Sequence, residues 1–234
     1  AIKNPGWQKA KLWVVQPSHM GYRAVHAKKW NMLQPDANLV KQLSSRLGCH
    51  PVTAAVLINR KLVSAEEASG FLATALHQMR PPFAIKDMDA AVDRICRAVQ
   101  DKEKILIFGD YDVDGISATA VLFEFLQATG ADVTPYIPHR IHEGYGLKPD
   151  HIENYALANH IRLVITADCG SGSTSAIAAA ATQGIDVVVT DHHEISENIP
   201  AAVAVLNPNR SDCTAGMETL AGVGVAFALV IALR

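Results

Sequence analysis

The sequence of 234 residues has only four cysteines, and no two of them lie close together. They are Cys49, Cys96, Cys169 and Cys213. Because no C-x-x-C pair is present, neither a zinc ribbon nor a small disulfide framework fits. Reduced thiols are expected instead, and with them a cytoplasmic location.

The sequence also lacks an apolar run long enough to cross a membrane. Its longest apolar stretch, Leu220–Leu233, is too short for a bilayer and is interrupted by glycines. It therefore predicts a buried helix, and no membrane partner is expected. The glycines of Gly222-Val223-Gly224 are expected to allow close helix packing.

A strong excess of one charge is absent as well. The net charge is −2, and 49% hydrophobic with 19% charged residues is typical of a globular protein with a substantial core. This balance excludes a wholly basic nucleic-acid binder, although a local basic groove would be enough to bind nucleic acid. The basic residues that precede the first acidic residue, Asp36, are Lys3, Lys9, Lys11, Arg23, Lys28 and Lys29. Residues 1–30 are therefore expected to form a solvated basic arm, flexible or foreign to the natural chain.

Residues 31–100 have the pattern of a small helical region. Asp36 can cap a helix that Gly48 ends, and Ser64 with Glu67 has the spacing of a capping box. After Pro81-Pro82 a further helix is predicted from about Asp87 to Gln100. This composition by itself indicates no function.

From residue 101 to 234 short apolar runs alternate with helical segments. The runs fall at 105–108, 133–137, 163–166, 186–190 and 203–206, and the helices fit 116–128, 150–158, 173–182 and 219–233. Such alternation predicts an α/β domain, with a parallel sheet of about five strands and helices on both faces.

Acidic and imidazole side chains follow three of the predicted strands. They are Asp110, Asp112 and Asp114, then Asp168, then Asp191, His192 and His193. Because ligands bind beyond the carboxyl ends of parallel strands, these groups are expected to converge in one crevice. Carboxylates packed this closely repel one another unless a cation neutralises them, and oxygen ligands with imidazole suit Mn²⁺ or Mg²⁺. The sequence therefore predicts a metal site.

Other interpretations of the acidic loop fit less well. An EF-hand would need Glu at the twelfth loop position from Asp110, where the chain has Val121. A haloacid-dehalogenase-type phosphatase would need a later Asp-Asp pair, which is missing. One of the three aspartates is free to cap the following helix, but helix capping does not account for all the strand-end groups. Hydrolysis of a phosphoester by a pair of divalent ions is the reaction class that fits best.

The motifs together resemble the DHH phosphoesterase superfamily, which is named for its Asp-His-His triplet, and within it the RecJ group of single-stranded-DNA exonucleases. The resemblance extends from about Lys28 to the end of the chain. It rests on the helical segments before residue 100, the loop at 109–115, the segments at 136–140 and 143–147, Asp168-Cys169-Gly170, the triplet at 191–193 and the segment at 220–226.

The resemblance implies a role for each candidate residue. The implied metal ligands for Mn²⁺ or Mg²⁺ are Asp112, Asp114, Asp168 and His192. The implied catalytic group comprises His193 facing the scissile phosphate, Asp191 orienting its neighbours and Asp110 supporting the site. Arg140 is an implied phosphate or DNA contact, with a solvated arginine as the open alternative.

The resemblance also implies an activity, the 5′-to-3′ removal of nucleotides from single-stranded DNA in DNA repair and recombination. A single-strand-binding protein and a helicase are the implied partners. The family carries a further metal-binding Asp and further domains beyond the segment at 220–226, so the chain is expected to be an N-terminal fragment with weak or no activity alone. The alternatives are an enzyme for small nucleotides or oligoribonucleotides, and a non-catalytic replication scaffold.

Overall fold

The computed structural model describes residues 31–73, 79–195 and 198–234. Contacts divide the chain into two compact units, Ala1–Thr74 and Ala75–Arg234. The predicted basic arm at 1–30 lies outside the described residues. None of the described helices combines the length and the hydropathy that a bilayer crossing requires.

The described residues of the first unit form three helices, α1 (Ala37–Leu47), α2 (Pro51–Asn59) and α3 (Ala65–Leu72). The predicted helix ends are confirmed. Asp36 accepts a hydrogen bond from the Leu39 N–H at 2.8 Å, and Gly48 ends α1 with a φ of 62°. The Ser64 hydroxyl caps α3 by accepting from the Glu67 N–H at 3.1 Å. The helices enclose a small core of their own, made of Leu43, Ala54, Leu57 and Ala68.

The second unit is built on a five-stranded sheet of order β2-β1-β3-β4-β5 in which every pair is parallel. The strands are β1 (Ile105–Gly109), β2 (Val133–Tyr136), β3 (Leu163–Ala167), β4 (Asp186–Thr190) and β5 (Ala204–Leu206). All five predicted strands are thus present, with ends that differ from the prediction by one residue at most. The order places β1 and β2 on one side of a switch point and β3 on the other.

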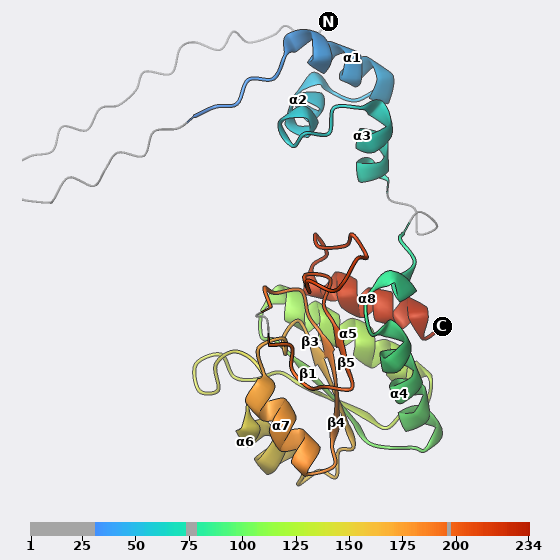
Figure 1. Ribbon diagram of the computed structural model, residues 1–234, viewed down its shortest axis with the longest axis vertical. Helices are drawn as coiled ribbons and strands as arrows, with labels where there is room; N and C mark the ends of the chain where they lie inside the picture. The colour runs from blue at the N-terminus through green and yellow to red at the C-terminus, as the bar shows by residue number, and fades with distance from the viewer. Residues whose placement is uncertain (1–30, 74–78, 196–197) are drawn as a thin grey trace, which may run out of the picture. The chain divides into compact units, whose positions relative to one another are not determined.

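Helices cover both faces of the sheet, as predicted (Figure 1). One face packs against α4 (Met88–Gln100), α5 (Val113–Ala128) and α8 (Gly222–Ala232). The other face packs against α6 (Pro149–His151), the π-helical turn η3 (Ile152–Ala156) and α7 (Thr174–Thr182). A 3₁₀ turn, η2 (Pro82–Ala84), precedes α4.

The two cores show why these runs became strands. Alternate residues of β1 point to opposite faces, so Ile105 and Ile107 join one core while Leu106 and Phe108 join the other. All four are fully buried. Burial on both faces explains the continuous apolar runs in the sequence, in place of the alternation of a half-exposed strand.

Three details of the second unit differ from expectation. Helix α5 begins at Val113, three residues before the predicted start, because the Asp112 side chain caps it. The predicted helix at 150–158 is one α-helical turn followed by a π-helical turn. Helix α4 lies in the second unit, although the sequence pattern grouped it with the N-terminal helices. The predicted domain limits themselves stay a proposal.

Candidate metal centre

The predicted site residues lie at the carboxyl ends of β1, β3 and β4. Asp110 directly follows β1, Asp168 directly follows β3 and Asp191 directly follows β4. Because β1 and β3 are neighbours at the point where the strand order reverses, a crevice is expected there.

Asp110 and Asp112 form the β1 side of the site. Asp110 is 4% exposed, and its Oδ1 atom receives no hydrogen bond. Burial, and then the charge of Asp112, raise the pKa of Asp110 above its ordinary value. Asp112 is exposed and caps α5, accepting from the Gly115 N–H at 2.9 Å. A Cβ atom at Gly115 would lie 2.6 Å from the Asp110 carbonyl oxygen, so only glycine fits this tight turn.

Asp114 connects the acidic loop to the last helix. Its two carboxylate oxygens accept from the N–H groups of Gly222 at 2.8 Å and Val223 at 2.7 Å, at the start of α8. A negative charge is favourable at this end of a helix. A Cβ atom at Gly222 would lie 2.2 Å from Asp168 Oδ1, so this glycine allows the helix start to approach the acidic loops.

Asp168 is the most unusual carboxylate of the site. It is 1% exposed, its φ is 63°, and its Oδ1 atom accepts no hydrogen bond although His192 Nε2 lies 3.2 Å away. Burial, followed by the charge of Asp114, raises the pKa of Asp168 to about 7. An ionisable side chain that is held in the left-handed region, with a buried oxygen that accepts no hydrogen bond, is costly, and such costs cluster at functional sites.

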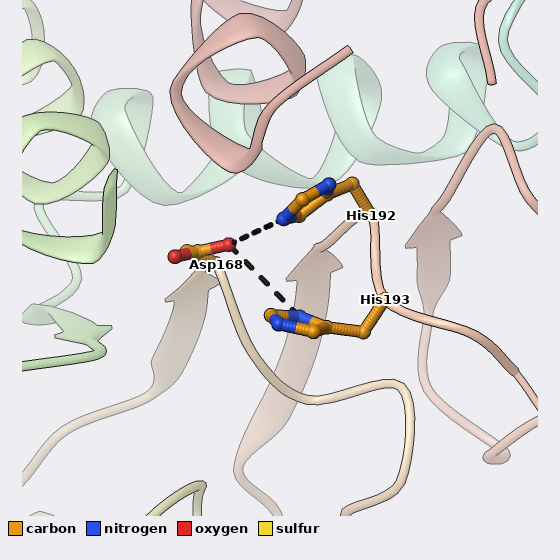
Figure 2. Close-up of side chains that lie close together, drawn as sticks. All are labelled: Asp168, His192 and His193. Carbon is orange, nitrogen blue, oxygen red and sulfur yellow. Dashed lines mark ion pairs between the residues drawn. The ribbon is translucent and has the colours of Figure 1, made fainter. Parts of the chain in front are cut away.

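The two histidines face this carboxylate from the end of β4. Figure 2 shows both rings directed toward Asp168, with His193 Nδ1 4.0 Å from Asp168 Oδ1. His193 Nδ1 also lies 2.8 Å from Asp191 Oδ1, and this hydrogen bond raises the pKa of His193 to about 9. The ring nitrogen Nδ1 therefore carries a proton and donates it to Asp191.

Asp191 has more hydrogen bonds than any other carboxylate of the site. It is 1% exposed and accepts from the N–H groups of Ser171 at 2.9 Å, His192 at 2.7 Å and His193 at 3.2 Å. Burial acts to raise the pKa of Asp191, but the hydrogen bonds from His193 and Ser171 outweigh it, so the pKa is lowered. A buried, ionised carboxylate held by several donors is suited to orienting its neighbours.

Two sets of three ligand atoms within 4.8 Å of one another share Asp168: one with Asp110 and Asp112, the other with His192 and His193. Asp114 belongs to neither set, although its Oδ2 lies 3.6 Å from His192 Nε2. Among the described residues, no lysine or arginine forms an ion pair with any of the four aspartates facing the crevice (Asp110, Asp112, Asp114 and Asp168). Carboxylate oxygens with imidazole nitrogens are a donor set that fits Mn²⁺ or Mg²⁺.

Two further side chains border the crevice. The guanidinium of Arg140 lies 5.0 Å from the centre of the Tyr111 ring, in the acidic loop. The Tyr145 hydroxyl lies 3.1 Å from His193 Nδ1 and 3.4 Å from the Asp168 carbonyl oxygen. Tyr145 belongs to the segment at 143–147 that supports the family resemblance, but the sequence analysis gave it no role in the site.

Two asparagines after β5 also had no predicted role. Asn207 donates to the His193 carbonyl oxygen at 2.9 Å, and Asn209 donates to the His192 carbonyl oxygen. Their only signal in the sequence is the polar Asn-Pro-Asn directly after the last apolar run.

Comparison with known proteins decides the family. The model of the DHH family, N-terminal domain, matches residues 104–233, which contain the whole sheet and the site. The chain belongs to the DHH family. The family resemblance seen in the sequence is thereby confirmed, and the DHH triplet is Asp191-His192-His193.

Among curated relatives of this DHH chain are two single-stranded-DNA-specific exonucleases named RecJ. The protein of Bacillus subtilis is 39% identical over 205 residues, covering 88% of the chain and 26% of the relative. The protein of Escherichia coli is 35% identical over 185 residues, covering 79% of the chain and 31% of the relative. The DHH chain thus spans about a quarter to a third of the length of these relatives.

Solved structures agree with this assignment. A RecJ exonuclease bound to manganese is 35% identical with a TM-score of 0.58, covering 64% of the DHH chain and 37% of the other. RecJ from Thermus thermophilus in complex with Mn²⁺ is 28% identical with a TM-score of 0.63, covering 85% and 27%.

Proposed function

We propose that the DHH chain is the metal-binding part of a divalent-metal-dependent exonuclease that removes nucleotides from single-stranded DNA in the 5′-to-3′ direction. The observation that carries the proposal is Asp168, a buried carboxylate that two candidate ligand sets share and whose Oδ1 accepts no hydrogen bond. The names of the relatives supply the substrate class, and the manganese in two similar structures supplies the metal class.

Each candidate residue has a task in this proposal. Asp110, Asp112 and Asp168 would hold one Mn²⁺ or Mg²⁺, and Asp168 with His192 would hold a second. Asp114 stays a proposed ligand through Oδ2, while its hydrogen bonds to α8 fix the loop. When bound, two such ions acidify a water molecule and neutralise charge on the reacting phosphate.

The residues outside the ligand sets would handle the substrate. His193 donates Nδ1–H to Asp191, which leaves Nε2 as the ring nitrogen for the scissile phosphate. Its raised pKa, about 9, keeps the ring protonated at neutral pH, so that it can donate a hydrogen bond to a phosphate oxygen. Arg140 beside the acidic loop would contact a phosphate of the strand.

A cytoplasmic location belongs to the same proposal, as do a single-strand-binding protein and a helicase as partners. The proposed location and partners follow from the names of the relatives, which are single-stranded-DNA-specific exonucleases. Repair and recombination of DNA would be the setting.

The test is a comparison of substrates in Mn²⁺. The chain, a version of it extended at its C-terminus, and both proteins carrying Asp112→Ala are incubated with 5′-labelled single-stranded DNA, duplex DNA and dinucleotides, and Mn²⁺ binding is measured by calorimetry. We expect Mn²⁺ binding that Asp112→Ala weakens, and cleavage by the extended version that prefers single-stranded DNA. Cleavage of dinucleotides alone would overturn the substrate class, and Mn²⁺ affinity unaffected by Asp112→Ala would overturn the metal site.

Arg140→Gln tests in the same assay whether Arg140 contacts the DNA. If Arg140 contacts a phosphate, its loss raises KM for single-stranded DNA about fivefold and leaves kcat and Mn²⁺ affinity unchanged, because the reacting groups are intact. Lys102→Gln, on the turn after α4 at the amino end of β1, is the control. An unchanged KM would identify Arg140 as a solvated side chain.

A further inference from the structure

The turn that follows β5, residues 207–210, contacts the backbone of the DHH triplet. Asn207 is fully buried, and both of its polar groups are used. Its Nδ2 donates to Ser171 Oγ at 2.7 Å and to the His193 carbonyl oxygen at 2.9 Å, while its Oδ1 accepts from the Asn209 N–H at 2.8 Å. Burying a fully polar side chain is costly unless every group is paired, and here each group is paired.

Each histidine of the triplet is held by a different asparagine. The Asn207 side-chain amide donates a hydrogen bond to the His193 carbonyl oxygen, and the Asn209 side-chain amide donates one to the His192 carbonyl oxygen. Neither histidine lies in a helix or a strand, so no regular hydrogen bonding fixes the backbone there. The two amide groups supply that restraint from outside the triplet.

The turn is itself fixed to a distant helix by Arg210. Arg210 is 7% exposed, donates from Nη1 to the Val205 carbonyl at 2.8 Å and forms an ion pair with Asp87, which precedes α4. Nε and Nη2 pair with the two Asp212 oxygens at 2.8 Å each. A planar guanidinium with several of its N–H groups bound gives the turn a rigid base.

Ser171 closes the arrangement. Its hydroxyl accepts from Asn207, and its N–H donates to Asp191 Oδ2 at 2.9 Å. The triplet is thus held at three points, by Ser171 on Asp191, by Asn209 on His192 and by Asn207 on His193. Groups that orient ligands in this indirect way commonly change metal affinity about 10- to 100-fold when removed.

We propose that Asn207 and Asn209 are positioning residues with separate tasks: Asn209 sets His192 for metal binding, and Asn207 sets His193 for the phosphate. This inference rests on the proposed function, because it assigns the two histidines the roles given there. It goes beyond that function by naming two residues outside the triplet and predicting that their effects separate.

The experiment compares Asn209→Ala, Asn207→Ser and a control, Asn159→Ala. Asn159 also donates to a backbone carbonyl, that of Tyr155 at 2.8 Å, but it is exposed and far from the triplet in the sequence. Mn²⁺ affinity is measured by calorimetry, kcat and KM on single-stranded DNA by cleavage, and the His193 ring signals by ¹⁵N NMR without metal.

We expect Asn209→Ala to weaken Mn²⁺ binding about tenfold. Asn207→Ser should keep Mn²⁺ affinity within about twofold, lower kcat about tenfold at constant KM and shift the His193 ring resonances. Asn159→Ala should change none of these. Asn209 is only half-buried, so Asn209→Ala is expected to fold. This variant therefore tests the effect on Mn²⁺ binding even if Asn207→Ser unfolds.

The possible results separate a failure of the asparagine roles from a failure of the proposed metal-dependent function. If the unaltered chain binds no Mn²⁺, the proposed function fails and this inference with it. If the chain binds Mn²⁺ but Asn209→Ala binds equally well, only this inference is overturned. Equal losses in Asn209→Ala and Asn159→Ala would overturn it too, because the effect would then not pass through His192.

Discussion

The two ends of the sheet both bury charge, but they balance it differently. At the amino ends of the strands, Arg94 of α4 pairs with Glu103 before β1 at 2.6 Å and with Asp186 of β4 at 2.5 Å. At the carboxyl ends, Asp110 and Asp168 are as deeply buried as Arg94, yet no arginine or lysine of the described residues pairs with them. At the amino ends, the buried arginine is balanced by two carboxylates, although its Nη1 atom has no hydrogen-bond partner. The carboxyl end has the charge pattern of a site that needs a cation.

Charge pairing at the amino ends of the strands concerns the stability of the fold, whereas the carboxylates at the carboxyl ends concern the binding of a ligand. A buried pair that lacks one partner destabilises a fold strongly, because the remaining charge stays in a poor solvent. Buried carboxylates without an arginine or lysine partner are candidates for ligand binding. Among the described residues of the sheet ends, Asp110 and Asp168 at the carboxyl end have this pattern, and Glu103 and Asp186 at the amino end do not.

The largest effect is expected from breaking the amino end. Arg94→Met keeps the packing of the side-chain stem but leaves Glu103 and Asp186 without their cation. Because the variant loses two charge-assisted hydrogen bonds of a buried guanidinium, while the half-exposed Asp186 regains water, we expect the free energy of unfolding to fall by about 3 kcal/mol, with Mn²⁺ affinity unchanged. Urea unfolding and calorimetry measure the two quantities.

The control is Arg97→Met, which removes an arginine of the same helix that has no ion pair in the described part of the chain. It should change stability by less than about 0.5 kcal/mol. Should Arg94→Met weaken Mn²⁺ binding as much as stability, the two ends would not be independent.

The next effect is expected at the carboxyl end, from Asp168→Asn. Asparagine tolerates the positive φ of 63° at this position, so the backbone should persist. Loss of the shared ligand should weaken Mn²⁺ binding about 100-fold, or about 2.7 kcal/mol. At the same time the metal-free protein should become more stable at pH 8, because a buried charge is gone.

These opposite signs exclude simple misfolding as the cause. Thermal unfolding without metal and calorimetry with Mn²⁺ measure them, and Asp89→Asn on the exposed surface of α4 is the matched control. A variant that loses both stability and affinity would contradict the interpretation of Asp168 as an unbalanced charge.

A smaller effect is expected from pH in the absence of metal. The pKa values of Asp168, about 7, and of His193, about 9, are both raised in the folded protein, so the fold binds these protons more tightly than the unfolded chain does. Stability from Asp168 is therefore full below its unfolded pKa, near 4, and is lost as the pH rises to about 7. The contribution of His193 is lost between about 6.5 and about 9.

Metal-free stability should consequently fall between pH 5 and pH 8. Saturating Mn²⁺ should stabilise the protein more at pH 8 than at pH 5, because it competes with the proton on Asp168. Urea unfolding at each pH tests both statements. A metal-free stability that rises over this range would show that other groups dominate the pH dependence.

The strand-end positions of the candidate site were predictable because they depend on local pattern alone. Fully buried runs such as Ile105–Phe108 are continuous in the sequence, and parallel strands bring their carboxyl ends together. The acidic residues that follow those runs could therefore be grouped from the sequence.

What could not be predicted depends on contacts between distant segments. The sequence predicts Asp114 as a metal ligand, but no local pattern signals that its carboxylate also accepts hydrogen bonds from the N–H groups at the start of α8. Asn207 and Asn209 likewise resembled an ordinary turn, because the carbonyl groups they hold belong to another strand connection. The π-helical turn at Ile152–Ala156 also escaped prediction, because its sequence fits an ordinary helix.

The contact between Asp114 and α8 has a consequence for how the protein is made. The two partners are 108 and 109 residues apart in the chain, so the acidic loop cannot reach its final geometry during synthesis until α8 has left the ribosome. A growing chain with β1, β3 and β4 already assembled would still lack the hydrogen bonds that fix the Asp114 side chain. Mn²⁺ affinity would then report whether α8 has docked against the acidic loop.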